Sequence, residues 1–319
     1  MSKKIKIGTV GIGLMGSSIA TCLLASGHFV TALTNNIREK EGAIKRIDEF
    51  LQQLKAEELI DEEPAEVLKK LHITDQYSAL KDHAVVIESV VENITEKRKV
   101  FAQLETVLTP DTLIGSNTSA IPVTLLQAEM QNPQRLFGIH WAEPAHLTRF
   151  MEIICGDQSD IQLAEKFSRL AESWGKEPSL IRKDIRGFIA NRVMYAMLRE
   201  AFYLVENGYA TIEDVDRSLR NDLGYWITFA GPFRFMDLTG IPAYLAVMND
   251  LFPDLCNDTK VPATIERLVK EGGKGVRNQQ GFYTYSEDTA RHWEKLFMEF
   301  SFEIRKLAGK YPQDAGEHI

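Results

Sequence analysis

A glycine-rich turn near the amino end limits what this chain can fold into. A short apolar run at 6–10 leads into Gly11-Ile12-Gly13-Leu14-Met15-Gly16, a helix-forming stretch follows, and a second apolar run begins just after Gly27. This order predicts a strand, a tight turn, a helix and a strand. Gly11 allows the sharp turn, Gly13 leaves room for a pyrophosphate, and Gly16 lets the helix pack against the strand. The free N–H groups at the helix start suit phosphates. The pattern therefore predicts a dinucleotide site, and the alternative is a glycine turn in another doubly wound domain.

Length and charge narrow the class of protein. A chain of 319 residues suits two domains. The net charge of −8 argues against nucleic acid or an anionic membrane as the main partner. No apolar run reaches the roughly 18 residues of a membrane span, and residues 1–5 lack a signal-peptide core. The three cysteines, Cys22, Cys155 and Cys256, are far apart in the sequence, so we expect neither a disulfide framework nor a metal site. This favours a cytoplasmic setting.

The residue after the second predicted strand bears on the choice of dinucleotide. In NAD-binding units an Asp or Glu there accepts hydrogen bonds from the adenosine ribose. This chain has Thr34, followed by Asn35, Asn36 and then Arg38. Without the carboxylate a 2′-phosphate is not repelled, and Arg38 could pair with it, so NADP stays open. We expect NAD instead, with Thr34 or Asn35 hydrogen-bonded to its ribose and Arg38 in solvent.

The remaining pattern predicts an α/β fold, a Rossmann-type doubly wound sheet followed by an all-α carboxyl-terminal domain. Residues 39–70 have helical spacing and break at 61–64 into a hairpin whose second helix would start at Pro64. Buried strands of a parallel sheet are expected near Ile73 and at 84–91. Further strands are expected at 112–115, 135–140, 150–154 and 178–181. From Phe188 onward the pattern is helical, with a buried helix expected first and a strand-like run only at 282–285. We place the domains at 1–185 and 186–319.

The chain resembles the L-3-hydroxyacyl-CoA dehydrogenase family over nearly its whole length. The resemblance rests on eight stretches, in order and at compatible spacings: Gly11–Gly16, Val90-Val91-Glu92-Asn93, Ser116-Asn117-Thr118-Ser119, Gly138-Ile139-His140-Trp141, Met151-Glu152-Ile153, Gly187-Phe188-Ile189-Ala190-Asn191-Arg192, Gly231-Pro232-Phe233 with Asp237, and Gly281-Phe282-Tyr283. It implies an NAD-dependent oxidoreductase of fatty acid metabolism that acts as a homodimer through its helical domain. Phe229, Phe233, Phe235 and Met236 are apolar enough to contribute, although core packing explains them equally well.

The resemblance assigns His140 and Glu152 as base and orienting acid. Oxidation of a secondary alcohol requires a proton to leave oxygen as hydride leaves carbon, and an imidazole accepts one near neutral pH. Glu152 lies twelve positions after His140, on the next predicted strand, and would balance the imidazolium charge. Ser119 and Asn191 carry over as hydrogen-bonding groups around the substrate oxygen and the histidine.

The resemblance also supplies cofactor contacts. Glu92, Lys97 and Ser119 match positions near the nicotinamide, and Arg277 stands where the family has a lysine. Glu143 replaces an asparagine that resembles a nicotinamide or substrate contact. The predicted cofactor-binding set is Gly11, Ile12, Gly13, Leu14, Met15, Gly16, Thr34, Asn35, Glu92, Lys97, Asn117, Glu143 and Arg277.

The helical hairpin departs from the family members that act on CoA thioesters. Where those enzymes offer a serine and a lysine to the CoA phosphates, this chain has Phe50 and Glu57. Each close exposed carboxylate would repel such a phosphate by ~1 kcal/mol. The neighbouring acidic residues are Glu58, Asp61, Glu62, Glu63 and Glu66.

Three readings of the activity therefore stand. The first is a 3-hydroxyacyl-CoA dehydrogenase. The second is a dehydrogenase of a free 3-hydroxy acid, as in the related gulonate and carnitine enzymes, with Arg149, Arg186 or Arg192 as the cation that meets the acid. The third is a non-catalytic protein like lambda-crystallin, which the presence of the complete catalytic set argues against.

Overall fold

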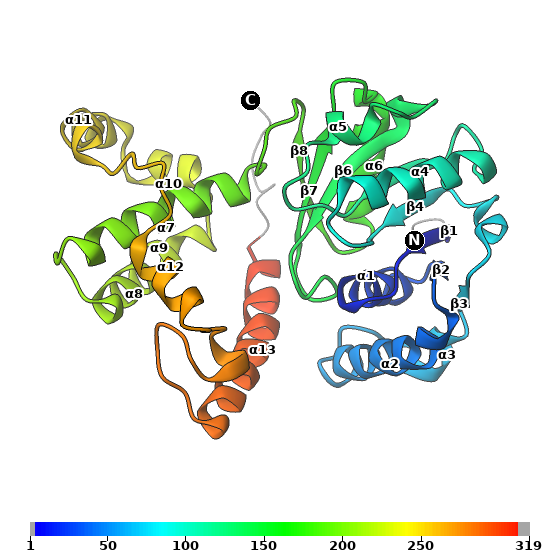
Figure 1. Ribbon diagram of the computed structural model, residues 1–319, viewed down its shortest axis with the longest axis horizontal. Coiled ribbons are helices and arrows are strands. Elements are labelled where there is room, and N and C mark those ends of the chain that lie inside the picture. Colours follow the sequence, from blue (N-terminus) through cyan, green and yellow to red (C-terminus); the bar gives the residue numbers. More distant parts are fainter. Residues whose placement is uncertain (1–3, 312–319) are drawn as a thin grey trace. The chain divides into compact units, whose positions relative to one another are not determined.

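The computed structural model describes residues 4–311 and divides into two compact units, 1–190 and 191–319. The first unit is built on one eight-stranded sheet (Figure 1). Its strands are β1 (Lys6–Val10), β2 (Phe29–Leu33), β3 (Leu71–Thr74), β4 (Val85–Glu88), β5 (Leu113–Ser116), β6 (Leu136–Trp141), β7 (Phe150–Cys155) and β8 (Glu177–Ile181). Its helices are α1 (Leu14–Ala25), α2 (Lys40–Ala56), α3 (Pro64–Leu68), α4 (Ile94–Val107), α5 (Val123–Gln127) and α6 (Ile161–Glu172).

The strand order is β3-β2-β1-β4-β5-β6-β7-β8, which confirms the Rossmann-type doubly wound sheet. From β1 the chain adds β2 and then β3 on one side of the sheet, and it then crosses to β4, which lies on the other side of β1. Ligands of such sheets bind at the carboxyl ends of the strands where the winding reverses, which here is between β1 and β4. Strands β4 and β5 are buried along their whole length, as expected for a sheet covered on both faces.

The glycine turn lies at this reversal point, and two of its glycines are required by their surroundings. Gly11 has φ +100°, and a Cβ atom there would lie 2.5 Å from the carbonyl oxygen of Ser89. A Cβ atom on Gly16 would lie 2.1 Å from the carbonyl oxygen of Gly11. Any larger residue at 16 would therefore push α1 away from the end of β1.

Strand β7 differs from the other strands of the sheet in its direction. It runs antiparallel to β6, while every other neighbouring pair is parallel. A parallel crossover needs about a dozen residues or more, usually with a helix. The connection at 142–149 is too short for that, so the chain turns back directly.

The second unit is helical where it is described. It contains α7 (Ala190–Glu206), which starts at the boundary, α8 (Ile212–Asn221), α9 (Leu223–Ile227), α10 (Pro232–Thr239), α11 (Ile241–Leu251), α12 (Ala263–Lys270) and α13 (Glu287–Gly309). The predicted strand at 282–285 is wrong, because this segment makes only an isolated bridge between Gln280 and Thr284. The prediction of a buried helix after Phe188 is also wrong for the single chain, since α7 has no buried residue. Its apolar face is only partly covered, since Met197, Leu198 and Phe202 are half-buried while Val193 is 60% exposed. Between residues 4 and 311 no helix is long and apolar enough to cross a membrane.

We predict that Gly16→Ala lowers the free energy of unfolding by about 1–3 kcal/mol, the usual cost of forcing an extra methyl group into a packed site. Gly42→Ala is the matched control, because Gly42 lies in α2 with no atom within 4 Å of its would-be Cβ. That variant should gain about 0.5–1 kcal/mol from the higher helix propensity of alanine. Urea unfolding measures the free energy of unfolding of both variants. Equal changes in this free energy would show that the glycine turn can rearrange to accept a methyl group.

Candidate active site

A cavity of about 320 Å³ opens at the carboxyl ends of β1, β4 and β5. It brings together seven of the residues predicted to bind the cofactor or substrate. Its lining residues are Gly13, Leu14, Met15, Gly16, Ser89, Val90, Val91, Glu92, Asn117 and Ser119. A Cβ atom on Gly13 would meet nothing within 4 Å, so the backbone there is open to a ligand. The start of α1 faces the same cavity, and its N–H groups and dipole favour an anionic group such as a pyrophosphate.

His140 and Glu152 form a buried pair. They are directly opposite residues of the antiparallel strands β6 and β7, and the Nδ1 atom of His140 lies 2.8 Å from an Oε atom of Glu152. His140 is 8% exposed and Glu152 is 1% exposed. Because Nδ1 is engaged by the carboxylate, proton exchange with a substrate falls to Nε2. The pairing that the sequence predicted is therefore present.

The second oxygen of Glu152 is held by backbone. It accepts hydrogen bonds from the N–H groups of Ile189, at 3.0 Å, and Ala190, at 2.8 Å, where α7 begins. These N–H groups have no acceptor within the helix, and the positive end of the helix dipole favours a carboxylate. The fully buried ring of Phe188 lies 5.6 Å from the His140 ring, and the Phe150 ring lies 5.3 Å from it. Both members of the pair are therefore held in place.

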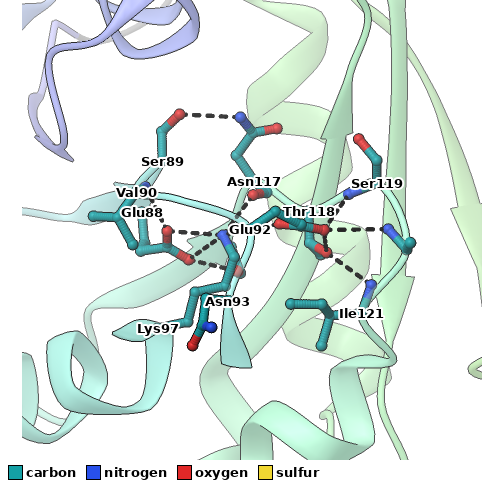
Figure 2. A network of polar contacts seen from close by, with 12 residues as sticks. Glu88, Ser89, Val90, Glu92, Asn93, Lys97, Asn117, Thr118, Ser119 and Ile121 are labelled. Atoms are coloured by element: carbon teal, nitrogen blue, oxygen red, sulfur yellow. Dashed lines mark hydrogen bonds and ion pairs between the residues drawn. The ribbon is translucent and has the colours of Figure 1, made fainter. Parts of the chain in front are cut away.

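A second cluster of charged groups lies at the ends of β4 and β5 (Figure 2). Lys97 is completely buried, and its Nζ atom lies 2.9 Å from one oxygen of Glu88 and 3.0 Å from the other. The same atom donates to the carbonyl oxygen of Asn117 at 2.8 Å and lies 3.4 Å from Glu92. Lys97 therefore lies behind the cavity wall, where it holds Asn117 and Glu92 rather than facing the cavity itself.

Glu92 joins this cluster to the turn that carries Ser119. Its Oε1 atom accepts hydrogen bonds from the Thr118 hydroxyl at 2.5 Å and from the N–H groups of Ser119 and Ala120. Burial alone would raise the pKa of Glu92. The hydrogen bond from Thr118, the charge of Lys97 and the two N–H groups outweigh burial and lower this pKa below its ordinary value. Glu92 is therefore a carboxylate at neutral pH.

Sequence reasoning missed two residues of this site. Glu88 is fully buried at the end of β4, and its signal in the sequence was a lone carboxylate within an apolar run. Arg46 of α2 donates to the carbonyl oxygen of Ile12 at 2.7 Å and contacts the hydroxyl of Ser17. The guanidinium therefore braces the glycine turn. No local pattern indicated this contact, because the two residues are 34 positions apart.

The residues predicted to meet the adenosine ribose lie at the end of β2. Thr34 is buried, and its hydroxyl accepts a hydrogen bond from the N–H group of Asn36 at 3.1 Å. Asn35 and Arg38 are exposed. Thr34 thus shapes the turn after the strand, and the exposed polar groups beside it remain open to a ligand.

The other predicted residues are more scattered. Glu143 is exposed and forms no hydrogen bond to any residue between 4 and 311. Arg149 is ion-paired with Glu177. Asn191 lies in the first turn of α7 in the second unit, and Arg277 lies in a short 3₁₀ turn (Val276–Asn278) of the same unit.

The acidic hairpin surface is partly neutralised. Ion pairs join Glu62 to Lys70, Glu63 to Lys55, and Glu66 to Lys69. The repulsion of a CoA phosphate expected from the sequence is therefore overestimated. Phe50, at the position of the family's serine, stacks on His146 with ring centroids 4.3 Å apart and offers no phosphate contact.

The sheet order, the glycine turn and the His–Glu pair define a Rossmann-fold, NAD-dependent dehydrogenase. The NAD binding domain of 3-hydroxyacyl-CoA dehydrogenase matches residues 6–185, and the C-terminal domain of the same enzymes matches residues 187–285. The chain belongs to the 3-hydroxyacyl-CoA dehydrogenase family, as the sequence resemblance implied. The cofactor of this family domain is NAD, which decides the choice left open at Thr34.

Relatives of the chain carry two kinds of name. It is 32% identical to 5-formyl-3-hydroxy-2-methylpyridine 4-carboxylate 5-dehydrogenase of Mesorhizobium japonicum, over 89% of this chain and 92% of that protein. It is 31% identical to a probable 3-hydroxybutyryl-CoA dehydrogenase of Deinococcus radiodurans, over 88% of this chain and 100% of that protein. A crystal structure of the pyridine carboxylate enzyme, an NAD⁺-dependent dismutase, matches with a TM-score of 0.88 at 29% identity over 97% and 100%. The (S)-3-hydroxybutyryl-CoA dehydrogenase of Ralstonia eutropha matches with a TM-score of 0.73 at 27% identity over 89% and 100%.

We predict that Glu92→Gln destabilises the protein at neutral pH and that the difference from wild type becomes smaller in acid. The folded-state pKa of Glu92 lies below its ordinary value of 4.5, so its charge stabilises the fold above that value. This contribution is lost as the pH falls through the folded pKa. Urea midpoints at about pH 7 and about pH 3.5 measure the change. Glu96→Gln is the control, because Glu96 pairs only with exposed Lys99 and should show little effect at either pH. A penalty for Glu92→Gln that persists unchanged in acid would contradict this assignment.

Proposed function

We propose that this protein transfers hydride between NAD and C3 of a 3-hydroxyacyl substrate, with His140 as the general base. The observation that carries the proposal is the 2.8 Å contact between Nδ1 of His140 and Glu152. An imidazole held in this way presents Nε2 to a substrate hydroxyl and takes its proton as the C–H bond breaks. Glu152 balances the resulting positive charge, and in the reverse direction His140 returns the proton to the carbonyl oxygen.

The cofactor site we propose is the cavity at the glycine turn. NAD, when bound, accepts the hydride. The open backbone at Gly13 and the N–H groups of α1 suit its pyrophosphate, while Glu92, Asn117 and Ser119 line the opposite wall, on the side we assign to the nicotinamide. Ser119 and Asn191 are proposed to hydrogen-bond the substrate oxygen. The remaining proposed contacts are Gly11, Ile12, Leu14, Met15, Gly16, Thr34, Asn35, Lys97 (through Glu92 and Asn117), Glu143 and Arg277.

A CoA thioester is the first candidate substrate, and it would place the reaction in fatty acid metabolism. Support comes from the family and from relatives named 3-hydroxybutyryl-CoA dehydrogenase. A free carboxylic acid is the second candidate. Its support is the stacking of Phe50 on His146, which leaves no phosphate contact at that position, and the TM-score of 0.88 to the pyridine carboxylate enzyme. Initial rates with acetoacetyl-CoA and with free acetoacetate, each with NADH, separate the two.

We predict that His140→Gln lowers kcat by about 10²–10⁴-fold, the range of a lost general base. The affinity for NADH, measured by fluorescence titration, should stay within about 3-fold, because His140 does not line the cofactor cavity. His83→Gln is the control, since His83 is also a buried histidine but lies before β4, outside the cavity. Near-normal turnover of His140→Gln would refute the assigned base.

We also propose that the protein is a homodimer formed through its helical unit. The support is the set of exposed apolar side chains of that unit: Val193 of α7 is 60% exposed, Phe233 is 78% exposed and Phe229 is 50% exposed. Monomeric proteins rarely expose contiguous apolar surface of this kind. Phe235 and Met236 are half-buried, and Phe235 stacks on Trp226, so they support the surface from beneath.

We predict that Phe233→Glu shifts the protein from dimer to monomer, because a charge in an apolar interface must be desolvated. Size-exclusion chromatography with light scattering measures the mass. Phe29→Glu is the matched control, since Phe29 is 51% exposed on β2 in the first unit, and it should leave the mass unchanged. Wild-type protein that is monomeric at assay concentrations would disprove the dimer.

A further inference from the structure

We propose that Glu88 is a positioning residue that fixes the turn at 116–120, and with it the side of the cofactor cavity that carries Asn117 and Ser119. This inference rests on the proposed function only in naming that side as the nicotinamide side. The Glu88 side chain does not line the cavity, so its action passes through Lys97, Ser116 and Glu92. Figure 2 shows Glu88, Lys97 and Glu92 in this network.

The position of Glu88 in the sheet is central. It is the last residue of β4, paired in register with Val10 of β1 on one side and with Ser116 of β5 on the other. Its backbone carbonyl accepts from the N–H group of Asn117 at 2.7 Å. Its side chain accepts from the Ser116 hydroxyl at 2.6 Å and from the N–H group of Val90 at 2.7 Å. One residue therefore joins the segment after β4 to the segment after β5.

Lys97 extends this connection to the turn. Three hydrogen bonds use the full donor capacity of its ammonium group: two to the oxygens of Glu88 and one to the carbonyl oxygen of Asn117. The same group lies 3.4 Å from Glu92, which accepts from the N–H groups of Ser119 and Ala120. The buried pair thus holds the turn at its beginning and, through Glu92, at its end.

The cost of burying these charges argues for a role beyond stability. An ion pair removed from water is often no more stabilising than an apolar pair of the same volume. Burial raises the pKa of Glu88, against the opposing effect of Lys97, which shows how unfavourable the site is for a charge without its partner. What an ion pair adds over an apolar pair is direction, because each donor and acceptor fixes the place of one neighbour.

The glycine turn depends on Glu88 less directly, because the side-chain hydrogen bonds of Glu88 go to Val90, Lys97 and Ser116 and not to the turn. Gly13, Leu14 and Met15 line the opposite part of the cavity, and they are placed by the ends of β1 and α1. Loss of Glu88 should therefore loosen one half of the site and spare the other. ADP-ribose, which lacks the nicotinamide, probes the spared half, and NADH probes both.

The test compares Glu88→Gln with wild type by isothermal titration with NADH and with ADP-ribose. We expect NADH to bind about 10-fold more weakly or worse, the range seen when outer hydrogen-bonding partners of a site are lost. The affinity for ADP-ribose should remain within about 3-fold. Equal weakening of both ligands, or of neither, would overturn the proposal. Because the readout is binding, it stands even if no tested substrate turns over, an outcome that would count against the proposed function alone.

Two further variants separate positioning from stability. Glu88→Gln combined with Lys97→Met removes the uncompensated charge, so we expect its thermal midpoint to recover toward wild type while the NADH defect persists. Recovery of both would show that the pair is merely structural. Glu105→Gln is the matched control: Glu105 is a buried carboxylate near Arg135 that accepts from the N–H groups of Gln131 and Asn132, away from the cavity. It should leave the ratio of the two affinities unchanged.

Discussion

The antiparallel pairing of β6 with β7 places His140 beside Glu152, and the chemistry that we propose depends on this contact. Opposite residues of such a pair lie within about 5.5 Å at their Cα atoms, so side chains of the length of His140 and Glu152 meet without any loop to position them. In a parallel arrangement the two would belong to strands joined by a crossover. The pair is further held by the first N–H groups of α7, which bind the second oxygen of Glu152.

The two charged clusters of the first unit are stabilised in the same way. Each contains a buried carboxylate on a strand, Glu88 at the end of β4 and Glu152 within β7, and each carboxylate accepts from a backbone N–H group outside the strands. Such groups must be satisfied, and carboxylates do so strongly. The result is that segments carrying Asn117, Ser119 and His140 are fixed by directional bonds rather than by packing alone. Fixed polar groups are what a dehydrogenase needs where charge develops during hydride transfer.

Much of this could be predicted from the sequence, and the failures have physical reasons. The glycine turn, the strand positions and the His140–Glu152 pair follow from local patterns and the family resemblance. The direction of β7 could not be predicted from its apolar run, because apolar runs do not encode direction; only the short connection at 142–149 favours a direct turn back. Glu88 and Arg46 act through contacts between distant segments, which periodicity does not reveal. The strand-like run at 282–285 failed because aromatic residues favour strands only where a partner strand exists.

The central claim is that His140 and Glu152 act as one unit in proton transfer. A double-mutant cycle on kcat with His140→Gln, Glu152→Gln and the double variant tests it directly, because groups that act together give non-additive losses. We expect the double variant to be no slower than His140→Gln alone, within about 3-fold, because Glu152 then has no imidazole to orient. Losses that multiply in the double variant would show that the two residues act independently and would contradict the account.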